Sequence, residues 1–353
     1  MSATWGNRFK ITLFGESHGA AIGVVIDGVP AGIKLDVLAI ERDMLRRSAK
    51  GKEGIATARR EEDKAEIVSG YFNGYTTGMP LTAVIRNGDT RSADYARTAS
   101  LMRPGHSDYG YYVKSGGFND YRGGGSSSGR LTAPMVFAGA VAKQILAAKG
   151  VNVGAHILSV ADVRDSSFDT IAPQLDEVDA NGMLDSGLWK DIKSRVEAAA
   201  ADGDSVGGVI ECAVCGLKAG VGEPLLDSVE SAIAHMMFSV PAVKGIQFGL
   251  GYAMCGMMGS EVNDSFYYDG DDVATRTNNN GGILGGITTG MPVIFNVAIK
   301  PTASIFKAQD TIDVSNERDA RLELRGRHDP CIVLRAVPVI EAAAAIAICD
   351  LTV

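Results

Sequence analysis

The chain has few cysteines, and their number is odd. It contains five cysteines among 353 residues, which argues against a disulfide framework. Cys212 and Cys215 are the one close pair. They lie in a stretch that reads as a strand, where residues three apart point to opposite faces, and no second pair exists to complete a zinc site. We therefore expect the cysteines to have packing roles and expect no bound metal.

Long apolar runs and an excess of positive charge are also missing. No stretch comes near the roughly 18 uncharged apolar residues of a membrane helix, and residues 1–8 lack the apolar region of a signal peptide. The net charge of −8 disfavours a general nucleic-acid binder. These absences predict a cytoplasmic protein that binds neither membranes nor nucleic acids.

Two nucleotide-binding motifs are absent. No Gly-x-Gly-x-x-Gly follows a predicted strand with an acidic residue about 20 positions further on, and no Gly-Lys-Ser/Thr of a P-loop occurs. A Rossmann domain and a P-loop nucleotide triphosphatase therefore lack support. With 46% apolar residues, the chain can bury a large core as one domain or two.

Three of the five histidines lie in tracts rich in glycine, proline and charge. His18 is in Gly-Glu-Ser-His-Gly, His106 in Arg-Pro-Gly-His-Ser-Asp and His328 in Arg-Gly-Arg-His-Asp-Pro. Such tracts form turns, and loops on a rigid scaffold often hold reacting groups. His156 and His235 have apolar neighbours, so we expect them to be buried packing residues. The pattern predicts an enzyme; the alternative is that a turn histidine only satisfies a backbone carbonyl.

The arginines gather beside these histidine tracts. In an acidic protein, this predicts a pocket for a small polyanion, because guanidinium groups match carboxylate and phosphate oxygens. A solvated surface is the alternative, and it is preferred for Arg42, on a predicted helix. The clusters are Arg42, Arg46, Arg47, Arg59 and Arg60, then Arg86, Arg91, Arg97, Arg103, Arg122 and Arg130, and finally Arg318, Arg321, Arg325, Arg327 and Arg335.

The chain repeats itself weakly but in order. Residues 15–33 align without gaps with residues 203–221, at seven identities in nineteen positions, and residues 70–80 match residues 282–292. Ordered matches make a duplication more plausible than a coincidence of glycine-rich composition. Both halves share a predicted helix (35–47 and 225–238), a strand (81–85 and 293–299) and an Ala-rich helix (135–149 and 339–351). An arginine and a proline precede each Ala-rich helix: Arg130 and Pro134 in the first half, Arg335 and Pro338 in the second.

This organisation favours an α+β fold. Strands with Gly-rich hairpin signals, flanked by long helices, differ from alternating βαβ units. We predict one domain, 1–353, made of two halves, about 8–150 and 203–351, related by a pseudo-two-fold axis. Residues 151–202 would join them and end in an amphipathic helix over 189–201. Ala-rich helices at one interface would approach closely, although such helices are also simply good helix formers.

Seven unusual motifs follow one another along the chain. They are Gly-Glu-Ser-His-Gly (15–19), Arg-Pro-Gly-His with Asp108 (103–108), Asp-Tyr-Arg-Gly-Gly-Gly (120–125), Pro-Ala-Val-Lys-Gly (241–245), Gly-Gly-Ile-Leu-Gly-Gly (281–286), Lys-Pro-Thr (300–302) and Gly-Arg-His-Asp-Pro-Cys (326–331). Together, and in the same order, they resemble the chorismate synthase family from about residue 5 to the C-terminus. The resemblance implies a β-α-β sandwich assembled as a homotetramer.

The resemblance also implies a reaction, the last step of the shikimate pathway toward aromatic amino acids. Phosphate and a ring proton leave 5-enolpyruvylshikimate 3-phosphate by anti-1,4-elimination to give chorismate, and the reaction requires reduced FMN although it is redox-neutral. The phosphate and two carboxylates of the substrate account for the arginine clusters. Because a dinucleotide fingerprint is lacking, we predict that an external flavin reductase supplies the reduced FMN and that NADPH is not used directly.

Site residues follow by resemblance. His106 would protonate the leaving phosphate, His18 would serve the flavin near N1, and Asp329 would assist removal of the C6 proton near flavin N5. The implied substrate-binding residues are Ser17, Arg47, Arg103, Arg130 and Arg327. The implied FMN-binding residues are Ser126, Ser127, Ser128, Pro241, Ala242, Gly285, Lys300, Pro301, Thr302, Ala303, Ser304 and Arg327.

The run Gly-Gly-Gly-Ser-Ser-Ser-Gly at 123–129 offers backbone N–H groups and hydroxyls to an anion. It precedes a helix that we expect to begin near Arg130, which suits the FMN phosphate or the edge of the flavin ring. A flexible linker is the alternative, and the flanking Arg122 and Arg130 disfavour it.

The sequence departs from the family pattern in two places. Ser126, Gly129 and Leu131 stand where Arg, Ala and Glu are usual. Residues 48–58 replace a basic tract, and Lys50 or Lys52 could restore its lost cationic contacts.

Two other functions stay open at this point. One is an FMN- or phosphosugar-binding protein whose histidines only bind anions, and the other is an NADPH-dependent flavin oxidoreductase. Formation of chorismate from the substrate and reduced FMN would distinguish the synthase from both.

Overall fold

The structure is a computed structural model that describes residues 2–49, 63–88, 99–324 and 328–353. The predictions for Lys50, Lys52 and Arg327 therefore concern residues outside the described ranges. Within those ranges, no helix combines the length and apolar character needed to cross a membrane.

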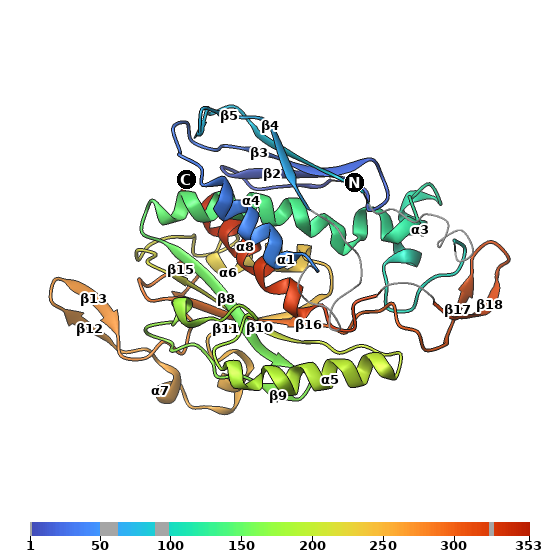
Figure 1. Ribbon diagram of the computed structural model, residues 1–353. Coiled ribbons are helices and arrows are strands. Elements are labelled where there is room, and N and C mark those ends of the chain that lie inside the picture. The colour runs from blue at the N-terminus through green and yellow to red at the C-terminus, as the bar shows by residue number, and fades with distance from the viewer. Residues whose placement is uncertain (1, 50–62, 89–98, 325–327) are drawn as a thin grey trace.

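Two five-stranded antiparallel sheets form the outer layers of a sandwich (Figure 1). The first contains β1 (Thr4–Trp5), β2 (Lys10–Gly15), β3 (Ala21–Asp27), β4 (Ala65–Ser69) and β7 (Leu81–Arg86), in the spatial order β1-β2-β3-β7-β4. The second contains β8 (Asn152–Val160), β9 (Val163–Arg164), β10 (Gly208–Cys215), β11 (Val243–Phe248) and β16 (Val293–Ile299), in the order β11-β16-β10-β8-β9.

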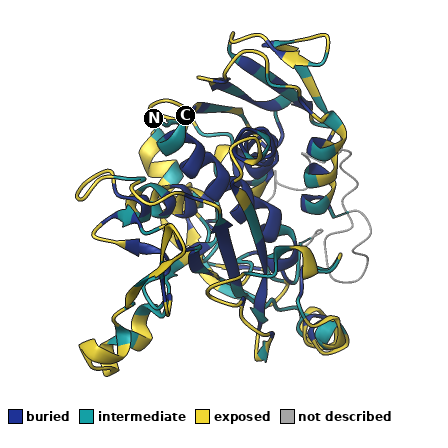
Figure 2. Cartoon of the chain, turned by 90° about the vertical axis from the view of Figure 1, so that its left-hand side faces the viewer, coloured by how far each residue is buried: buried dark blue, intermediate teal, exposed yellow. Residues whose placement is uncertain are grey.

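Helices fill the space between the sheets (Figure 1). They are α1 (Val37–Arg47), α4 (Thr132–Ala147), α6 (Val229–Ser239) and α8 (Val333–Thr352). Figure 2 shows that the buried residues concentrate in this layer and on the sheet faces turned toward it. The predicted α+β class, as a β-α-β sandwich, is confirmed.

Smaller elements lie around this sandwich. Short hairpins are β5 (Tyr71–Phe72) with β6 (Tyr75–Thr76), β14 (Ile283–Leu284) with β15 (Ile287–Thr288), β12 (Phe266–Asp269) with β13 (Asp272–Thr275), and β17 (Gln309–Asp313) with β18 (Arg318–Leu322). The remaining helices are α3 (Asp108–Ser115), α5 (Trp189–Ala201) and α7 (Gly259–Val262), with 3-10 turns at Arg122–Ser127, Gly129–Leu131, Leu175–Glu177, Ser186–Leu188 and Gly251–Gly256.

The two sheets share one topology. The order β2-β3-β7-β4 in the first sheet corresponds to β8-β10-β16-β11 in the second. In each half, a helix of eleven residues follows β3 or β10 in the chain, a short hairpin precedes β7 or β16, and a long helix ends the unit. Residues 151–202 are more than a joint, because they supply β8 and β9 to the second sheet. The bounds of the predicted halves and the single domain stay a prediction.

The repeat extends to single hydrogen bonds. Thr76 Oγ1 accepts one from the Ile33 N–H, and Thr288 Oγ1 accepts one from the Val221 N–H, both at 2.9 Å. Each hydroxyl also donates to the carbonyl three residues before that N–H, at 2.6 and 2.7 Å. These positions are equivalent in both sequence alignments, so the matched glycine and threonine positions mark the same turn in each half.

The two long helices cross in the middle of the molecule. A Cβ atom on Gly139 of α4 would lie 2.2 Å from the Cβ of Ala342 on α8, which confirms the expected close approach. The prediction for α8 was too short, because the helix starts at Val333 and holds Pro338 in its interior. Residues 333 and 334 are buried, and this burial stabilises a first turn that the proline alone would disfavour.

Other helix starts also differ from the prediction. Asp36 and Ser228 cap α1 and α6 by accepting hydrogen bonds from backbone N–H groups, so these helices begin at 37 and 229 rather than 35 and 225. A 3-10 turn over 129–131 precedes α4, which begins at Thr132. The predicted helix 189–201 matches α5.

The two histidines expected in the core behave differently. His156 is fully buried, but it is not simply packed among apolar groups, since its Nε2 lies 2.9 Å from Glu211 Oε2. The prediction for His235 was wrong, because this residue is exposed. Helix α6 turns Ile233 and Met237 to the core, and position 235 falls about 200° away from both around the helix.

The cysteine prediction is confirmed for Cys212 and Cys215. They lie on β10 with free thiols; Cys212 packs in the main core, whereas Cys215 packs in a second cluster on the other face. Across the described part of the chain, no three His, Cys, Asp or Glu side chains are placed to hold a metal ion. Arg42 has a surface ion pair with Asp36 at 3.7 Å, as expected for a solvated helix face.

Candidate functional site

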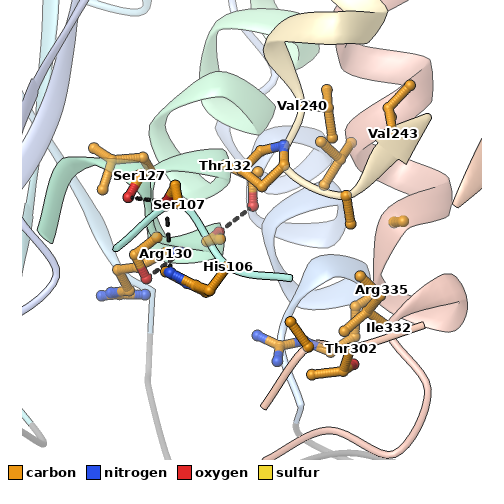
Figure 3. Close-up of a pocket in the computed structure, with 18 of the residues that line it drawn as sticks. His106, Ser107, Ser127, Arg130, Thr132, Val240, Val243, Thr302, Ile332 and Arg335 are labelled. Atoms are coloured by element: carbon orange, nitrogen blue, oxygen red, sulfur yellow. Dashed lines mark hydrogen bonds between the residues drawn. The ribbon is translucent and has the colours of Figure 1, made fainter. Parts of the chain in front are cut away.

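A cavity of about 770 Å³ lies where the two halves meet (Figure 3). Its volume falls within the roughly 300–1,000 Å³ typical of small-molecule sites. The first half contributes the end of α1, residues 103–107 and residues 126–132; the second half contributes residues 238–244, residues 300–304 and the start of α8. The site therefore draws on both copies of the repeat.

Most of the predicted site residues that the structure describes line this cavity. They are Arg47, Arg103, His106, Ser126, Ser127, Ser128, Arg130, Pro241, Ala242, Lys300, Pro301, Thr302, Ala303, Ser304 and Asp329. His328 lines it as well, with its ring 5.7 Å from that of Phe306. The folded chain thus gathers residues that are nearly 300 positions apart in sequence.

Ser17 and His18 lie directly behind the cavity wall. A Cβ atom on Gly123, which lines the cavity, would be 2.6 Å from His18 Cδ2 and 3.0 Å from Ser17 Oγ. Both residues are buried. One glycine backbone separates them from the cavity, and their substrate and flavin roles stay predictions.

Gly285 does not line the cavity. It lies in the turn between β14 and β15, and the carbonyl of the adjacent Gly286 accepts a hydrogen bond from Val229, the first residue of α6. The opposite end of α6 lines the cavity, and a helix of eleven residues is about 16 Å long. The assignment of Gly285 to FMN stays a prediction.

His106 is paired with a carboxylate. Its Nδ1 lies 2.6 Å from Asp108 Oδ1 and 3.2 Å from Arg103 Nη2. A carboxylate only accepts and an arginine only donates, so the shorter contact favours a proton on Nδ1. Nε2 is then the ring nitrogen that exchanges a proton with a ligand.

Asp108 is held ionised by its neighbours. It accepts hydrogen bonds from Arg103 Nε at 2.7 Å and Arg103 Nη2 at 2.8 Å. Burial alone would raise the pKa of this carboxyl, but the hydrogen bonds from His106 and Arg103 outweigh it and hold the pKa well below the usual range. The charged Asp108 fixes the orientation of the His106 ring through the contact at Nδ1.

Every arginine that lines the cavity, among the residues described, has a carboxylate partner. Arg103 pairs with Asp108, Arg335 pairs with Asp329 at 2.7 Å, and Asp63 holds both Arg47 and Arg130. Among the described residues, six cationic side chains line the cavity and three carboxylates hold the four arginines, so positive charge exceeds negative charge. The cations are Arg47, Arg103, Arg130, Arg335, Lys244 and Lys300.

The glycine and serine run is a fixed turn rather than a flexible linker. Gly123, Gly124 and Gly125 have φ angles of 60°, 87° and 55°, which side chains disfavour. Ser127 Oγ donates to the Gly124 carbonyl and accepts from Ser107 Oγ, each at 2.7 Å. A Cβ atom on Gly124 would lie 3.0 Å from His106 Cε1, so the run also provides the surface against which the imidazole packs.

The other side of the cavity is apolar. Figure 3 shows Val240 and Val243 across the cavity from His106 and Ser127. Met135, Phe238, Ile332, Ala336 and Val339 extend this surface. Thr302 Oγ1 is a buried polar atom at the wall for which the described chain provides no hydrogen-bond partner, so it is suited to a ligand.

Sequence reasoning missed Asp63 and gave Arg335 no role of its own. Asp63 follows two glutamates in what reads as a surface charge run, and nothing in the sequence distinguishes it. Arg335 was named only within the third arginine cluster and at the start of a helix, without its partner Asp329. Arg335 Nε donates to the Arg47 carbonyl at 3.0 Å, which ties α8 to the end of α1.

Comparisons with known proteins agree on one family. The model of the chorismate synthase family matches residues 9–353. A protein named chorismate synthase from Dehalococcoides mccartyi is 44% identical over 353 residues, covering 99% of this chain and 96% of that protein. Another so named, from Chitinophaga pinensis, is 46% identical over 347 residues, covering 98% and 95%. A crystal structure of chorismate synthase superposes with a TM-score of 0.77 at 26% identity, covering 98% and 92%.

Proposed function

The chain belongs to the chorismate synthase family, and we propose that this lyase of a phosphate ester forms chorismate from 5-enolpyruvylshikimate 3-phosphate by anti-1,4-elimination with reduced FMN. The reaction would complete the shikimate pathway toward aromatic amino acids. Conserved catalysis is supported by the match over nearly the whole length of the relatives and by the cavity described above.

The observation that carries this proposal is the charge of the cavity. Among the described residues, positive charge at the cavity exceeds the negative charge of the carboxylates that hold its arginines, which suits a ligand with one phosphate and two carboxylates. A non-catalytic anion site would need the same cations, but it would not need a histidine held by a carboxylate. The pair of His106 and Asp108 therefore favours catalysis over simple binding.

His106 would act as the general acid. In the protonated form of His106, Nε2 would donate a proton to the oxygen that joins the phosphate to the ring carbon as that carbon–oxygen bond breaks. Nδ1 stays bonded to Asp108 at 2.6 Å. Asp108 stabilises the imidazolium before the transfer and fixes the ring orientation. Arg103, held by the same carboxylate, neutralises charge on the leaving group.

Asp329 would take part in removing the ring proton. Arg335 Nη1 donates to its Oδ2 at 2.7 Å and fixes the carboxylate at the cavity wall. An ionised carboxylate is an acceptor for a proton. Asp329 and His106 come from the two halves of the chain, so they can serve different ends of one substrate.

The residues present fit FMN. The apolar surface around Val240 and Val243 suits a flat aromatic ring, Lys300 suits its phosphate, and the partnerless Thr302 Oγ1 suits a polar edge. Ser126, Ser127, Ser128, Pro241, Ala242, Pro301, Ala303 and Ser304 would complete the contacts, with Gly285 and Arg327 as the predicted additions. When bound, reduced FMN supplies an electron-rich ring beside the substrate.

The finer features of the proposal concern the whole protein. We propose a cytoplasmic homotetramer that receives reduced FMN from an external flavin reductase. Large apolar side chains that are exposed in the single chain support an assembly; Phe238 on α6 is 56% exposed, and Tyr252 and Tyr268 are 81% and 82% exposed. The lack of a dinucleotide fingerprint supports an external source of reducing equivalents.

One anaerobic experiment tests the function. The protein is mixed with dithionite-reduced FMN and 5-enolpyruvylshikimate 3-phosphate, and the absorbance of chorismate is followed. Sustained formation is expected; binding without turnover would support the anion-binding alternative instead. In a second arm, oxidised FMN and NADPH replace the reduced flavin. Chorismate formation in that arm would overturn the need for an external reductase.

A further inference from the structure

Asp63 is buried beside the cavity in an unusual backbone conformation. Its side chain is 1% exposed, and its φ angle of 48° lies in the left-handed region. Non-glycine residues adopt this region rarely, and the surrounding structure must compensate for the cost. Asp63 does not itself line the cavity.

Each carboxylate oxygen of Asp63 holds a different arginine. Oδ2 accepts a hydrogen bond from Arg47 Nη1 at 2.6 Å, and Oδ1 accepts one from Arg130 Nη1. Both arginines line the cavity, and their side chains are each 4% exposed. Asp63 therefore joins two cationic parts of the wall, one at the end of α1 and one in the 3-10 turn that precedes α4.

The arginines are also fixed by neutral acceptors. Arg47 Nε donates to Thr132 Oγ1 at 2.9 Å, and its Nη2 donates to the Gly129 carbonyl at 3.0 Å. Arg130 Nε donates to Asn87 Oδ1 at 3.2 Å. A guanidinium has five N–H donors, so one arginine can bond to several protein acceptors and to a ligand at once.

Charge supports the same arrangement. Burial alone would raise the pKa of Asp63, but the charges of Arg47 and Arg130, with their hydrogen bonds, outweigh it and lower the pKa. One anion between two cations leaves one positive charge in excess. The Asp63 carboxylate also offsets the repulsion between the two buried guanidinium groups.

We propose that Asp63 is a positioning residue for substrate binding: it sets the separation and orientation of Arg47 and Arg130 so that both meet the anionic groups of one ligand. This inference rests on the proposed function of the cavity. Positioning of the arginines differs from an effect of the Asp63 charge alone, because removing one negative charge would by itself strengthen the binding of anions.

Replacement by asparagine distinguishes the two roles. The amide of Asp63→Asn keeps one oxygen acceptor but turns an N–H₂ toward a guanidinium, which also donates. One arginine is therefore released. We expect KM for the substrate to rise at least about 10-fold, with kcat within about 3-fold, because binding is lost rather than chemistry. Inhibition by inorganic phosphate should weaken as well, despite the added positive charge.

A double-mutant cycle provides the decisive test. If Asp63 acts through these two arginines, Asp63→Asn should raise KM less in an Arg47→Gln or an Arg130→Gln background than in the wild type. Independent, additive effects would overturn the proposal, as would an unchanged KM in Asp63→Asn or tighter phosphate inhibition. Asp63→Glu keeps the charge and should restore part of the affinity. Asp162→Asn, which removes an exposed partner of Arg195, is the matched control and should leave KM unchanged.

Two safeguards keep the test interpretable. If Asp63→Asn does not fold, Asp63→Glu is measured in its place, because it keeps the charge and moves the carboxylate; a raised KM supports positioning and an unchanged KM overturns it. If the wild-type protein forms no chorismate, the proposed function fails. Asp63 is then judged by calorimetry with inorganic phosphate, where weaker binding in Asp63→Asn supports positioning and equal or tighter binding overturns it.

Discussion

Helices α1 and α6 occupy equivalent places in the two halves, yet they bring opposite chemistry to the cavity. Each has eleven residues, a capping side chain at its start and its last turn near the cavity. Helix α1 ends in Arg46 and Arg47, whereas α6 ends in Phe238 and Ser239. The shared backbone plan fixes the position of each helix end, and the side chains there determine what the position does.

The charged end needs partners that the apolar end does not. Arg46 forms two hydrogen bonds of 2.7 Å with the buried Glu341 of α8, which also lies 3.1 Å from Lys143 of α4. At the end of α6, Val240 and Val243 pack in the main core. The end of α1 therefore provides a charged part of the wall, and the end of α6 provides an apolar part that suits a flat ring. Four predictions test this contrast, from the largest expected effect to the smallest.

The first prediction concerns Glu341, the partner of the charged helix end. Burial alone would raise its pKa, but the charges of Lys143 and Arg46 outweigh it and lower the pKa to about 2. Glu341→Gln should reduce the free energy of unfolding at neutral pH by about 3 kcal/mol, because it breaks a buried ion pair.

The lowered pKa of Glu341 also predicts how the free energy of unfolding changes with pH. A carboxyl with a lowered folded pKa contributes stability above its unfolded pKa of 4.5 and loses it as pH falls toward 2. Denaturant unfolding between pH 5 and 2 should therefore show a flatter decline for Glu341→Gln than for the wild type. Glu197→Gln, in an exposed pair with Lys193, should match the wild type. An equally steep decline in Glu341→Gln would contradict the assignment.

The second prediction compares a histidine of the charged wall with a histidine of α6. His106→Ala should lower kcat about 100-fold or more, because it removes the general acid, while FMN binding measured by fluorescence stays near that of the wild type. His235→Ala removes an exposed imidazole 5.8 Å from the Trp5 ring and should keep normal turnover. Near-normal kcat in His106→Ala would refute its role.

The third prediction concerns the contact between the halves. The Cβ of Gly139→Ala would lie 2.3 Å from the Ala342 Cα atom, so the two central helices must separate. We expect a loss of about 1–3 kcal/mol in the free energy of unfolding. Gly110→Ala in α3 has open space around its Cβ and should gain about 0.5 kcal/mol instead. Equal stability of the two variants would show that the crossing tolerates a methyl group.

The fourth prediction separates the position of His106 from its chemistry. Gly124→Ala places a methyl group against the imidazole in a backbone conformation with φ of 87°, and a shifted ring should lower kcat about 10-fold. Gly74→Ala has φ of 89° and no neighbour within 4 Å, so it carries the backbone cost alone. If both variants lose activity equally, strain rather than displacement of His106 is responsible.

Much of the fold could be predicted because turns leave local signals. The alignment of Gly32 and Thr76 with Gly220 and Thr288 correctly indicated equivalent turns, since those positions depend on backbone conformation and on one short side chain. His235 was misplaced because its apolar neighbours on α6 face both the core and the solvent. A list of neighbours in sequence does not give the direction in which a helical residue points.

The candidate site was predicted less completely than the fold. His106, Asp108 and Arg103 lie within six residues of one another, so a single turn brings them together; the motif contains all three, although their pairing was seen only in the structure. Asp63 and Arg335 contact partners that are distant in sequence, 67 residues away for Arg130 and 288 for Arg47. No local pattern records such a contact.

The sequence by itself determined the family and the α+β class, because these depend on motifs and on local backbone preferences; the reacting groups that it indicates stay a prediction. Only the tertiary structure decided which carboxylate neutralises which arginine. It also decided that the end of α1 lies in a charged part of the cavity wall, whereas the end of α6 lies in an apolar part. Burial explains the difference: the partners of Asp63 and Glu341 are fixed by the low-dielectric interior, where an unpaired charge is too costly to persist. That interior exists only after both sheets have closed over the helices.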